Sequence, residues 1–335
     1  MNYSIKKIKP YESNLVVTLN KDDLEHYLNE AGKNLANELK LDGFRKGKAP
    51  LEVAKDKLDS RALLSAAFDL AFKQSFADVL AKEKLELIDA GNLEVKENSS
   101  GRLIYSLRFT VFPDFELADY KNIRIKRNDI LPVSLEEIDK TLEFIRNSRK
   151  TNGAAPPLTD DFAKSLGRFE NLEQLKDSIS QGLKEEKEFR ESRRIQGLVL
   201  DKIAEKTKVE VPPVLLEKQL DQLFLDLDAD LHQQGLELGP YLAKIKKTAE
   251  DLRNEWRPKA EMLVKKSLLM REVAKKENIK VEPDEVRGKI DSFIGNLGIA
   301  GEMEKNIDLQ KLAVQIEQLI LNQKVLAFLE KEATL

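Results

Sequence analysis

The start of the chain changes from an alternating pattern of apolar and polar positions to a helical one. Two β-forming runs, residues 3–5 and 15–19, flank Pro10, which favours a turn. From Lys21 the apolar residues follow the spacing of one helical face: Leu24, Leu28, Ala31, Leu35 and Leu39. The pattern predicts a β-hairpin and then a helix that ends near residues 42–43.

The next part of the chain repeats the two patterns in the opposite order. Residues 51–84 predict a second helix, which is apolar on nearly every side and is therefore expected to be buried. Alternation returns at residues 93–95 and 103–111, on either side of a turn at 98–101. These elements predict a small α+β domain that closes near residues 112–113.

Long helices dominate the rest of the sequence. Ser134 and Glu137 have the spacing of a capping box at the start of one helix. Residues 151–160 are typical of a linker, and Asn171 is the expected N-cap of a long helix that reaches about Lys206. Four further helices are expected, and they begin near Val214, Thr248, Pro283 and Asp308.

These patterns together predict a mostly α protein with a small α+β N-terminal domain and an elongated helical arm domain at the C-terminus. The expected boundaries are 1–127 for the first domain, 128–159 for a linker with a connecting helix, and 160–335 for the helical domain. Charged residues make up 34% of the chain and aromatic residues only 6%. That balance is typical of extended helices with solvated faces.

Composition also excludes several classes of protein. The net charge of −3 is too small to draw the whole molecule to nucleic acid or to an anionic membrane. Because the chain has no cysteine, a disulfide framework, a thiolate nucleophile and a cysteine-bound metal site are excluded. The N-terminus has no continuous apolar segment, and no apolar run is long enough to cross a bilayer. We therefore expect a cytoplasmic protein without a membrane partner.

One segment interrupts the helical pattern. Residues 43–50, Gly-Phe-Arg-Lys-Gly-Lys-Ala-Pro, contain two glycines and a proline, which do not continue a helix. The segment carries three cations within four positions, and Lys55 and Lys57 add two more. Such a loop can dock on phosphates or acidic side chains while Phe44 fills a pocket. By composition alone, a solvated basic loop is an equally good interpretation.

The motif resembles the ribosome-docking signature of bacterial trigger factor, which in that family lies in the same helix-to-helix loop and contacts a protein at the polypeptide exit. Residues 109–113 and 157–167 resemble the family's exit from the docking domain and entry into the C-terminal domain, and 257–261 and 274–286 resemble its helical arms. The implied partner is the ribosome near the polypeptide exit, through a ribosomal protein and ribosomal RNA. The implied docking residues are Gly43, Phe44, Arg45, Lys46, Gly47, Lys48 and Pro50.

The resemblance implies a ribosome-associated molecular chaperone that holds nascent and unfolded polypeptides and assists their folding and export, without a cofactor. Whether the protein forms a weak homodimer is left open by the resemblance. Full-length relatives carry an FKBP-like prolyl isomerase domain, which needs many strands and an aromatic-lined pocket. Here only residues 128–159 are available, and Phe144 is the single aromatic among them. We therefore expect no catalytic residue and no enzyme activity.

The helix after Pro213 carries the candidate client-binding surface. Its apolar stripe is wider than one helix seam requires, and it comprises Leu216, Leu220, Leu223, Phe224, Leu227 and Leu231. A leucine stripe at helical spacing is more often core, so each residue alone is weak evidence. On the same helix Asp228, Asp230 and His232 resemble a metal set, but only Asp228 and His232 share a face, and a solvated surface is the better interpretation.

Other functions remain as alternatives. A prolyl isomerase of the trigger factor family is one, and the missing domain argues against it. An RNA-binding protein that uses the basic loop is another, although residues 1–127 hold 22 Lys or Arg against 20 Asp or Glu and are nearly neutral. An elongated structural helical protein would leave the loop unexplained.

Overall fold

The structure, a computed structural model, divides the chain into two compact units. It describes residues 1–38, 59–150, 154–297 and 308–334. The first unit consists of Met1–Glu116 and Lys208–Leu268, and the second of Leu117–Thr207 and Leu269–Leu335. The three domains expected from the sequence stay a prediction.

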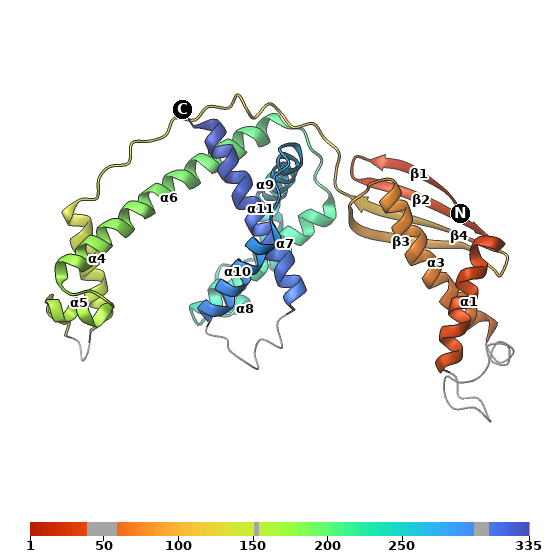
Figure 1. Ribbon diagram of the computed structural model, residues 1–335, viewed down its shortest axis with the longest axis horizontal. Helices are drawn as coiled ribbons and strands as arrows, with labels where there is room; N and C mark the ends of the chain where they lie inside the picture. The colour runs from red at the N-terminus through yellow and green to blue at the C-terminus, as the bar shows by residue number, and fades with distance from the viewer. Residues whose placement is uncertain (39–58, 151–153, 298–307, 335) are drawn as a thin grey trace. The chain divides into compact units, whose positions relative to one another are not determined.

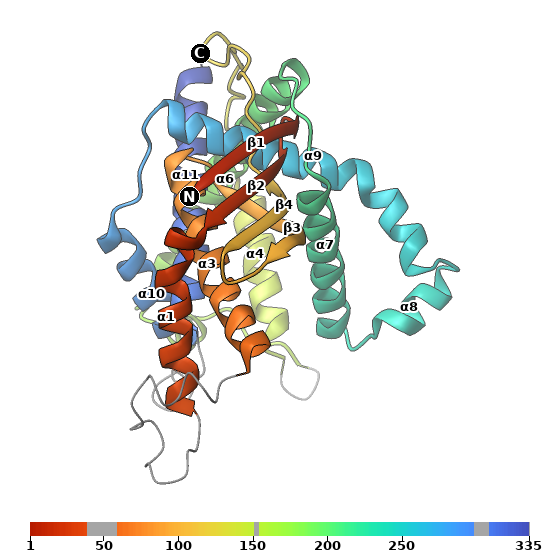
Figure 2. The same cartoon turned by 90° about the vertical axis from the view of Figure 1, so that its right-hand side faces the viewer.

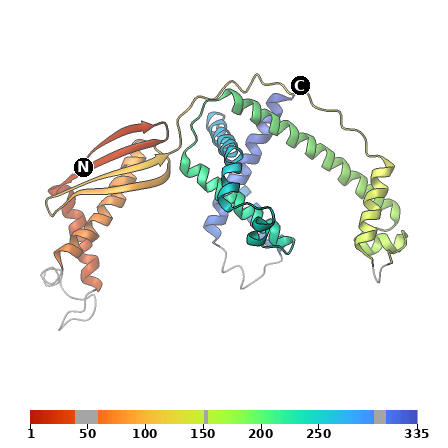
Figure 3. The same ribbon diagram turned by 180° about the vertical axis from the view of Figure 1, so that it is seen from behind.

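The N-terminal part of the first unit is a four-stranded antiparallel sheet with two helices on one face (Figures 1 and 3). The strands lie in the order β1-β2-β4-β3. Their bounds are β1 Asn2–Lys9, β2 Glu12–Asn20, β3 Leu87–Asn98 and β4 Arg102–Val111. The helices are α1 Lys21–Glu38 and α3 Ser60–Lys82. The predicted hairpin, the two helices within the described residues and the second strand pair are confirmed.

Alternation along the strands builds the core of this layer. Leu15, Val17 and Leu19 of β2 are buried and pair in register with buried residues of β4, namely Leu107, Tyr105 and Leu103. Since successive strand residues point to opposite faces, all six side chains face the two helices. The core of the layer is therefore built at the centre of the sheet, where β2 and β4 pair.

The burial predicted for the second helix is only partly correct. Ala67, Ala71, Phe76 and Val79 of α3 are buried, whereas Leu63 and its apolar neighbours are half-buried. The helix packs on a sheet at one side and on α1 at another, and its remaining side faces solvent. An apolar residue on that side is covered only by its neighbours along the helix.

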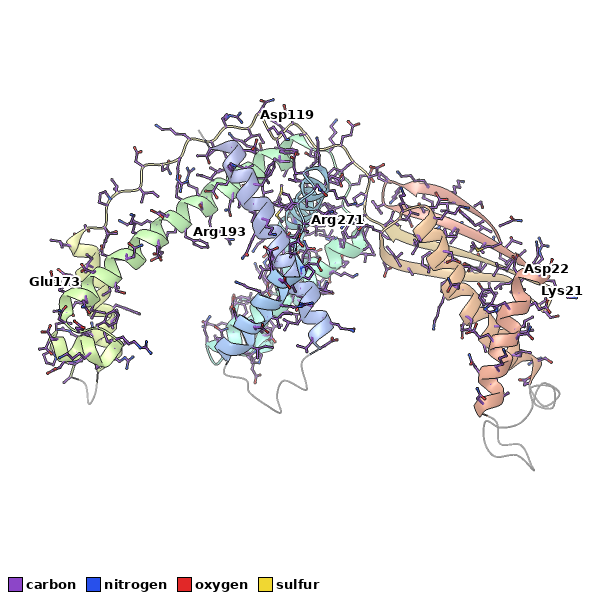
Figure 4. All side chains as sticks on the ribbon, viewed as in Figure 1. Lys21, Asp22, Asp119, Glu173, Arg193 and Arg271 are labelled. Carbon is purple, nitrogen blue, oxygen red and sulfur yellow. The ribbon has the colours of Figure 1, made fainter. Side chains whose placement is uncertain are left out.

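Start and stop signals in the sequence predicted most of the remaining helices correctly. Ser134 and Glu137 form the capping box, and Asn171 and Asp308 cap their helices through side-chain oxygens. The helices are α4 Leu135–Ser148, α5 Asp160–Leu166, α6 Leu172–Lys206, α7 Pro213–Gln233, α8 Leu238–Lys244, α9 Ala249–Lys276, α10 Pro283–Leu297 and α11 Leu309–Ala333. Figure 4 labels Glu173 in the first turn of α6, where a carboxylate complements the helix dipole.

Two short helices, α5 and α8, were not expected. Each spans seven residues, which is too short for a periodic apolar stripe. Gly239 and Pro240 are residues that often end a helix, but here they lie in the first turn of α8, where proline is tolerated.

An extended segment in the second unit, residues 117–128, is called the strap here; Figure 4 labels Asp119 within it. Its apolar side chains Tyr120, Ile123 and Ile125 are buried. The Ile125 amide donates to the Ala333 carbonyl at 2.9 Å, and the Ala118 amide donates to the Thr207 hydroxyl at 3.2 Å. The strap is therefore packed along its length against helix ends of its own unit.

Carboxylates of the surrounding helices hold the strap. Glu191 of α6 accepts the Asn128 amide at 2.7 Å and is paired with Arg194. These contacts lower the pKa of the Glu191 carboxyl to about 2, and the contact with Arg194 has the largest effect. Glu277 accepts the Tyr120 hydroxyl and pairs with Lys121 at 2.9 Å.

A small cluster of helices forms a separate core in the second unit. The three-helix cluster, as we call it, consists of α4, α5 and the first turns of α6. Its buried residues are Ile138, Leu142, Phe162, Ala163, Leu175 and Ile179. The connecting helix expected within residues 128–159 is thus α4, and it packs on the beginning of the helical region that follows.

Candidate functional site

The predicted docking segment lies outside the described residues. This holds for every predicted docking residue: Gly43, Phe44, Arg45, Lys46, Gly47, Lys48 and Pro50. The flanking elements are described. α1 and α3 lie side by side on the sheet, and the end of α1 lies at the same end of this helix pair as the start of α3 (Figure 1). The segment therefore joins two helices that a common core holds in place.

The predicted client surface lies on α7 (Figure 2). Arginines of α9 form ion pairs with this helix. Arg253 pairs with Asp221 and also with Glu217 at 3.2 Å, and Arg257 pairs with Glu217 at 3.0 Å. The contact with Asp221 raises the pKa of the Arg253 guanidinium. These pairs connect two helices that are separated in sequence by α8.

An aromatic contact lies beside these charges. The rings of Phe224 and Trp256 are 5.0 Å apart between centroids, and the Arg253 guanidinium lies 5.3 Å from the Phe224 ring centre. Aromatic and cation–π contacts of this kind each contribute about 0.5–1.5 kcal/mol. Phe224 therefore helps to hold α7 against α9, and only part of its side chain is exposed for contact with a ligand.

Burial divides the six predicted client-binding residues into two groups. Leu220 and Leu231 are buried, so in this conformation they pack α7 and are not on its surface. The others are half-buried, and their contact with clients stays a prediction: Leu216, Leu223, Phe224 and Leu227.

Sequence reasoning missed the most exposed apolar side chain of α7. Leu225 is 63% exposed. In the same unit Leu236, which follows α7, and Met262 and Leu263 of α9 are also exposed. Leu225 lies on the side of the helix opposite the predicted stripe, among acidic residues. The signal in the sequence is a single apolar residue on an otherwise polar helix face. A search for apolar stripes does not detect it.

Two kinds of site are absent from the described part of the chain. His232 lies 3.5 Å from Asp228, but no three His, Cys, Asp or Glu residues come together there in a way that could hold a metal ion. Among the same residues, no helix has the length and apolar content needed to cross a membrane.

Models of known protein families match nearly the whole chain. A family model described as "Bacterial trigger factor protein (TF)" matches residues 1–145. A second, described as "Bacterial trigger factor protein (TF) C-terminus", matches residues 171–331. Only residues 146–170 lie between the two matches.

Similar proteins align over the same extent. The trigger factor of Clostridium kluyveri is 23% identical over 426 aligned residues, which cover 98% of this chain and 98% of that protein. The trigger factor of Caldanaerobacter subterraneus subsp. tengcongensis is 26% identical and covers 87% of this chain and 88% of its own. The first alignment is longer than the 335 residues of this chain, so that relative carries residues without a counterpart here.

A solved structure has a similar fold. It was reported under the name "Promiscuous Substrate Recognition in Folding and Assembly Activities of the Trigger Factor Chaperone", with a TM-score of 0.54 and 18% identity over 98% of this chain and 99% of that chain. Both halves of the chain match the same family, and a short connection, residues 146–170, lies between the two matches. The chain belongs to the trigger factor family and lacks its middle, prolyl isomerase region.

Proposed function

We propose that this protein is a ribosome-associated chaperone that docks near the polypeptide exit and holds nascent or unfolded chains. The observation that carries the proposal is the match of two trigger factor family models over residues 1–145 and 171–331, with the basic motif at 43–50 inside the first. Both the docking part and the helical part of the family are thus represented in one chain.

The docking role belongs to the motif between α1 and α3. Phe44 supplies an apolar anchor, while Arg45 and Lys46 supply charge for phosphate or carboxylate partners on the ribosome. The core that holds α1 and α3 lies between the helices and the sheet. Substitutions in the motif should therefore change binding without changing the fold.

Ribosome cosedimentation tests the docking role. We expect the combined substitutions Phe44→Ala, Arg45→Ala and Lys46→Ala to abolish cosedimentation while helicity stays the same. A matched control, Lys6→Ala with Lys7→Ala, removes two exposed cations from β1 of the same domain and should leave binding intact. Undiminished cosedimentation of the triple variant would refute the docking assignment.

Client holding belongs to the apolar surface of the α7–α9 region. Non-directional apolar burial suits a chaperone that accepts many sequences, because its strength depends on area and not on a fixed pattern. Leu225, Met262 and Leu263 expose apolar surface there, and Leu223 and Leu227 expose part of theirs. We expect weak binding of unfolded polypeptides, measured as slower aggregation of a denatured protein.

The chain performs this role without prolyl isomerisation. Residues 128–159 lead into the three-helix cluster, whose core is aliphatic apart from Phe162 and Phe169. A protease-coupled assay on a short proline peptide should show exchange at the uncatalysed rate, which takes tens to hundreds of seconds at about 25 °C. Faster exchange with purified protein would contradict this part of the proposal.

A further inference from the structure

The arginines of α9 hold a part of the chain that has little core of its own. This part, residues 236–257, comprises α8 and the first turns of α9 and is called the tip here (Figure 2). The structure describes the whole of this range, and Leu252 is the only buried side chain in it. Lys247 donates to both carboxylate oxygens of Glu255, at 2.6 and 2.7 Å, and so connects the two ends of the connection between α8 and α9. Apolar burial therefore contributes little to the position of the tip.

The tip is bounded by two positions at which the backbone can turn. Gly235, directly after α7, has a positive φ of 70°, which glycine adopts without strain. Pro258 lies inside α9, and because proline has no amide hydrogen, the helical bond to the Asn254 carbonyl cannot form. Beyond this position α9 buries Val264 and Leu268. The tip can therefore turn while the rest of α9 stays packed.

Long charged side chains make the contact between the tip and α7. Arg253 pairs with Asp221 and also with Glu217 at 3.2 Å, and Arg257 pairs with Glu217 at 3.0 Å. These four residues are called the latch here. The backbones of α7 and α9 pack less closely than those of α1 and α3. The latch therefore bridges two helices that are not in close backbone contact.

Three of the four latch residues also have an opposite charge one turn away on their own helix. The pairs are Glu250 with Arg253, Arg257 with Glu261, and Lys218 with Asp221. Side chains three or four residues apart on a helix are neighbours, so pairs within each helix can replace the pairs between the helices. These three charges can therefore be paired both when the tip lies against α7 and when it has turned away.

We propose that the latch is a salt-sensitive device that holds the tip against α7 and lets it turn about Gly235 and Pro258 when salt screens the pairs between the helices. The side chains of Glu217 and Asp221 are 49% and 59% exposed, so dissolved ions reach them. Turning separates the rings of Phe224 and Trp256, which are 5.0 Å apart between centroids in the closed arrangement. The open tip thus exposes aromatic surface that the closed tip partly covers.

Salt distinguishes this device from a contact that apolar burial maintains. The Debye length falls from about 10 Å at 0.1 M salt to about 3 Å at 1 M, which weakens attraction between exposed charges. Apolar burial is not weakened in this way, and strongly hydrated salts strengthen it. A tip held by apolar packing stays closed at high salt, whereas the latch opens. The device requires neither ribosome nor client, so it stands or falls apart from the function proposed above.

Acrylamide quenching of Trp256, the single tryptophan of the chain, tests the proposal in the whole protein. We expect the quenching constant to rise by roughly twofold between about 0.05 and 1 M sodium chloride, because screening of the latch exposes the ring. The urea-unfolded chain at the same salt concentrations is the reference for a fully exposed tryptophan. A quenching constant that stays level or falls as salt rises overturns the proposal.

Variants separate the charge of the latch from its shape. Arg253→Gln with Arg257→Gln should give strong quenching of Trp256 already at low salt, with no further rise. Arg253→Lys with Arg257→Lys keeps both charges and should keep the dependence on salt. The matched control, Lys244→Gln with Lys259→Gln, removes two exposed cations of the same region and should behave as the unaltered chain does.

Far-ultraviolet circular dichroism shows whether each variant keeps its helices. If the folded glutamine variant is quenched as the unaltered chain is at every salt concentration, the latch does not hold the tip and the proposal is wrong. The same conclusion follows if the lysine variant loses the dependence on salt, or if the control variant loses it too. Should the glutamine variant fail to fold, the salt series on the unaltered chain and on the lysine variant still decides.

Discussion

The sheet layer of the first unit and the strap of the second are stabilised in different ways. In the sheet layer, twelve buried residues with an almost entirely apolar character lie between four strands and two helices. Phe76 contacts the ring of Phe109 edge to face at 5.6 Å. The strap also buries apolar side chains, but its backbone and ends are held by Glu191, Glu277 and Arg194 through ion pairs and hydrogen bonds.

The difference has consequences for how each region responds to change. Apolar burial contributes roughly 25 cal/mol per Å² and does not depend on pH. A partly buried carboxylate stabilises the fold through its ion pairs and hydrogen bonds, and it does so only while it is ionised and its partners stay in position. The sheet layer should therefore tolerate acid but not cavities, and the strap should tolerate small changes of volume but not loss of one carboxylate.

The largest effect is expected from a cavity in the sheet layer. Phe109→Ala removes a buried ring that contacts Phe76, and we expect a loss of about 3–5 kcal/mol in the free energy of unfolding of this layer. The measurement is hydrogen exchange of β2 and β4 peptides as urea increases.

Arg108, the neighbour of Phe109, provides the matched control. Its side chain points to the open face of the sheet and lies 3.6 Å from Glu12 at an exposed position. Arg108→Ala should cost no more than about 1 kcal/mol, because exposed ion pairs contribute little. Similar losses for the two variants would show that the layer does not depend on its apolar core.

A smaller effect is expected from Glu191, whose side chain is 8% exposed. Glu191→Gln keeps the shape but removes the charge that binds Arg194 and the Asn128 amide, and we expect a cost of roughly 1–3 kcal/mol. Peptides of residues 117–128 should exchange faster, while those of β2 and β4 should not. Equal acceleration in both regions would contradict the distinction drawn between them.

The stabilisation that the Glu191 carboxylate provides should depend on pH, and comparison with the same variant measures it. The pKa of Glu191 falls from 4.5 to about 2 in the folded protein, so its contribution is fully present above pH 4.5 and is lost as the pH falls towards 2. The difference between unaltered chain and variant should therefore shrink over that interval. A difference that stays constant down to pH 2 would show that the carboxylate does not hold the strap through its charge.

The fold could be predicted from sequence wherever one local signal decides the structure. The capping box at Ser134, the N-cap Asn171 and the alternation along β4 each specify their element without help from distant residues. The path of the strap could not be predicted, because the Ile125 amide finds its acceptor at Ala333, at the other end of the chain. Contacts at such separation leave no periodic pattern in either segment.

The candidate sites show the same limit. The basic motif at 43–50 is recognisable because its residues are consecutive, and it resembles a known family. The contacts of Arg253 with Glu217 and Asp221 join two helices, and these residues have no spacing that is typical of a site. On α7 the stripe was recognised but its two possible roles were not separated, since a core leucine and a client-binding leucine have the same period.

The smallest effect on stability is expected from Leu225→Ser, which tests the separation of core from surface on α7. Leu225 is exposed and contributes little to packing, so the free energy of unfolding should change by less than about 0.5 kcal/mol. Leu220→Ala on the same helix should cost about 2–5 kcal/mol, because Leu220 is fully buried. Urea unfolding followed by Trp256 fluorescence measures both, since Trp256 contacts Phe224 of α7.

The two variants should rank in the opposite order when client holding is measured: Leu225→Ser should impair holding, whereas Leu220→Ala should not. Full burial of a leucine contributes about 1.5–3 kcal/mol, and a client covers only part of Leu225, so its loss should raise the chaperone concentration that halves aggregation by roughly twofold. Folded Leu220→Ala should hold a client as well as the unaltered chain does, because its side chain is not on the surface. If Leu225→Ser holds a client without change, the exposed side of α7 is solvated surface, and holding rests on Leu223, Leu227 and their neighbours on the half-buried side.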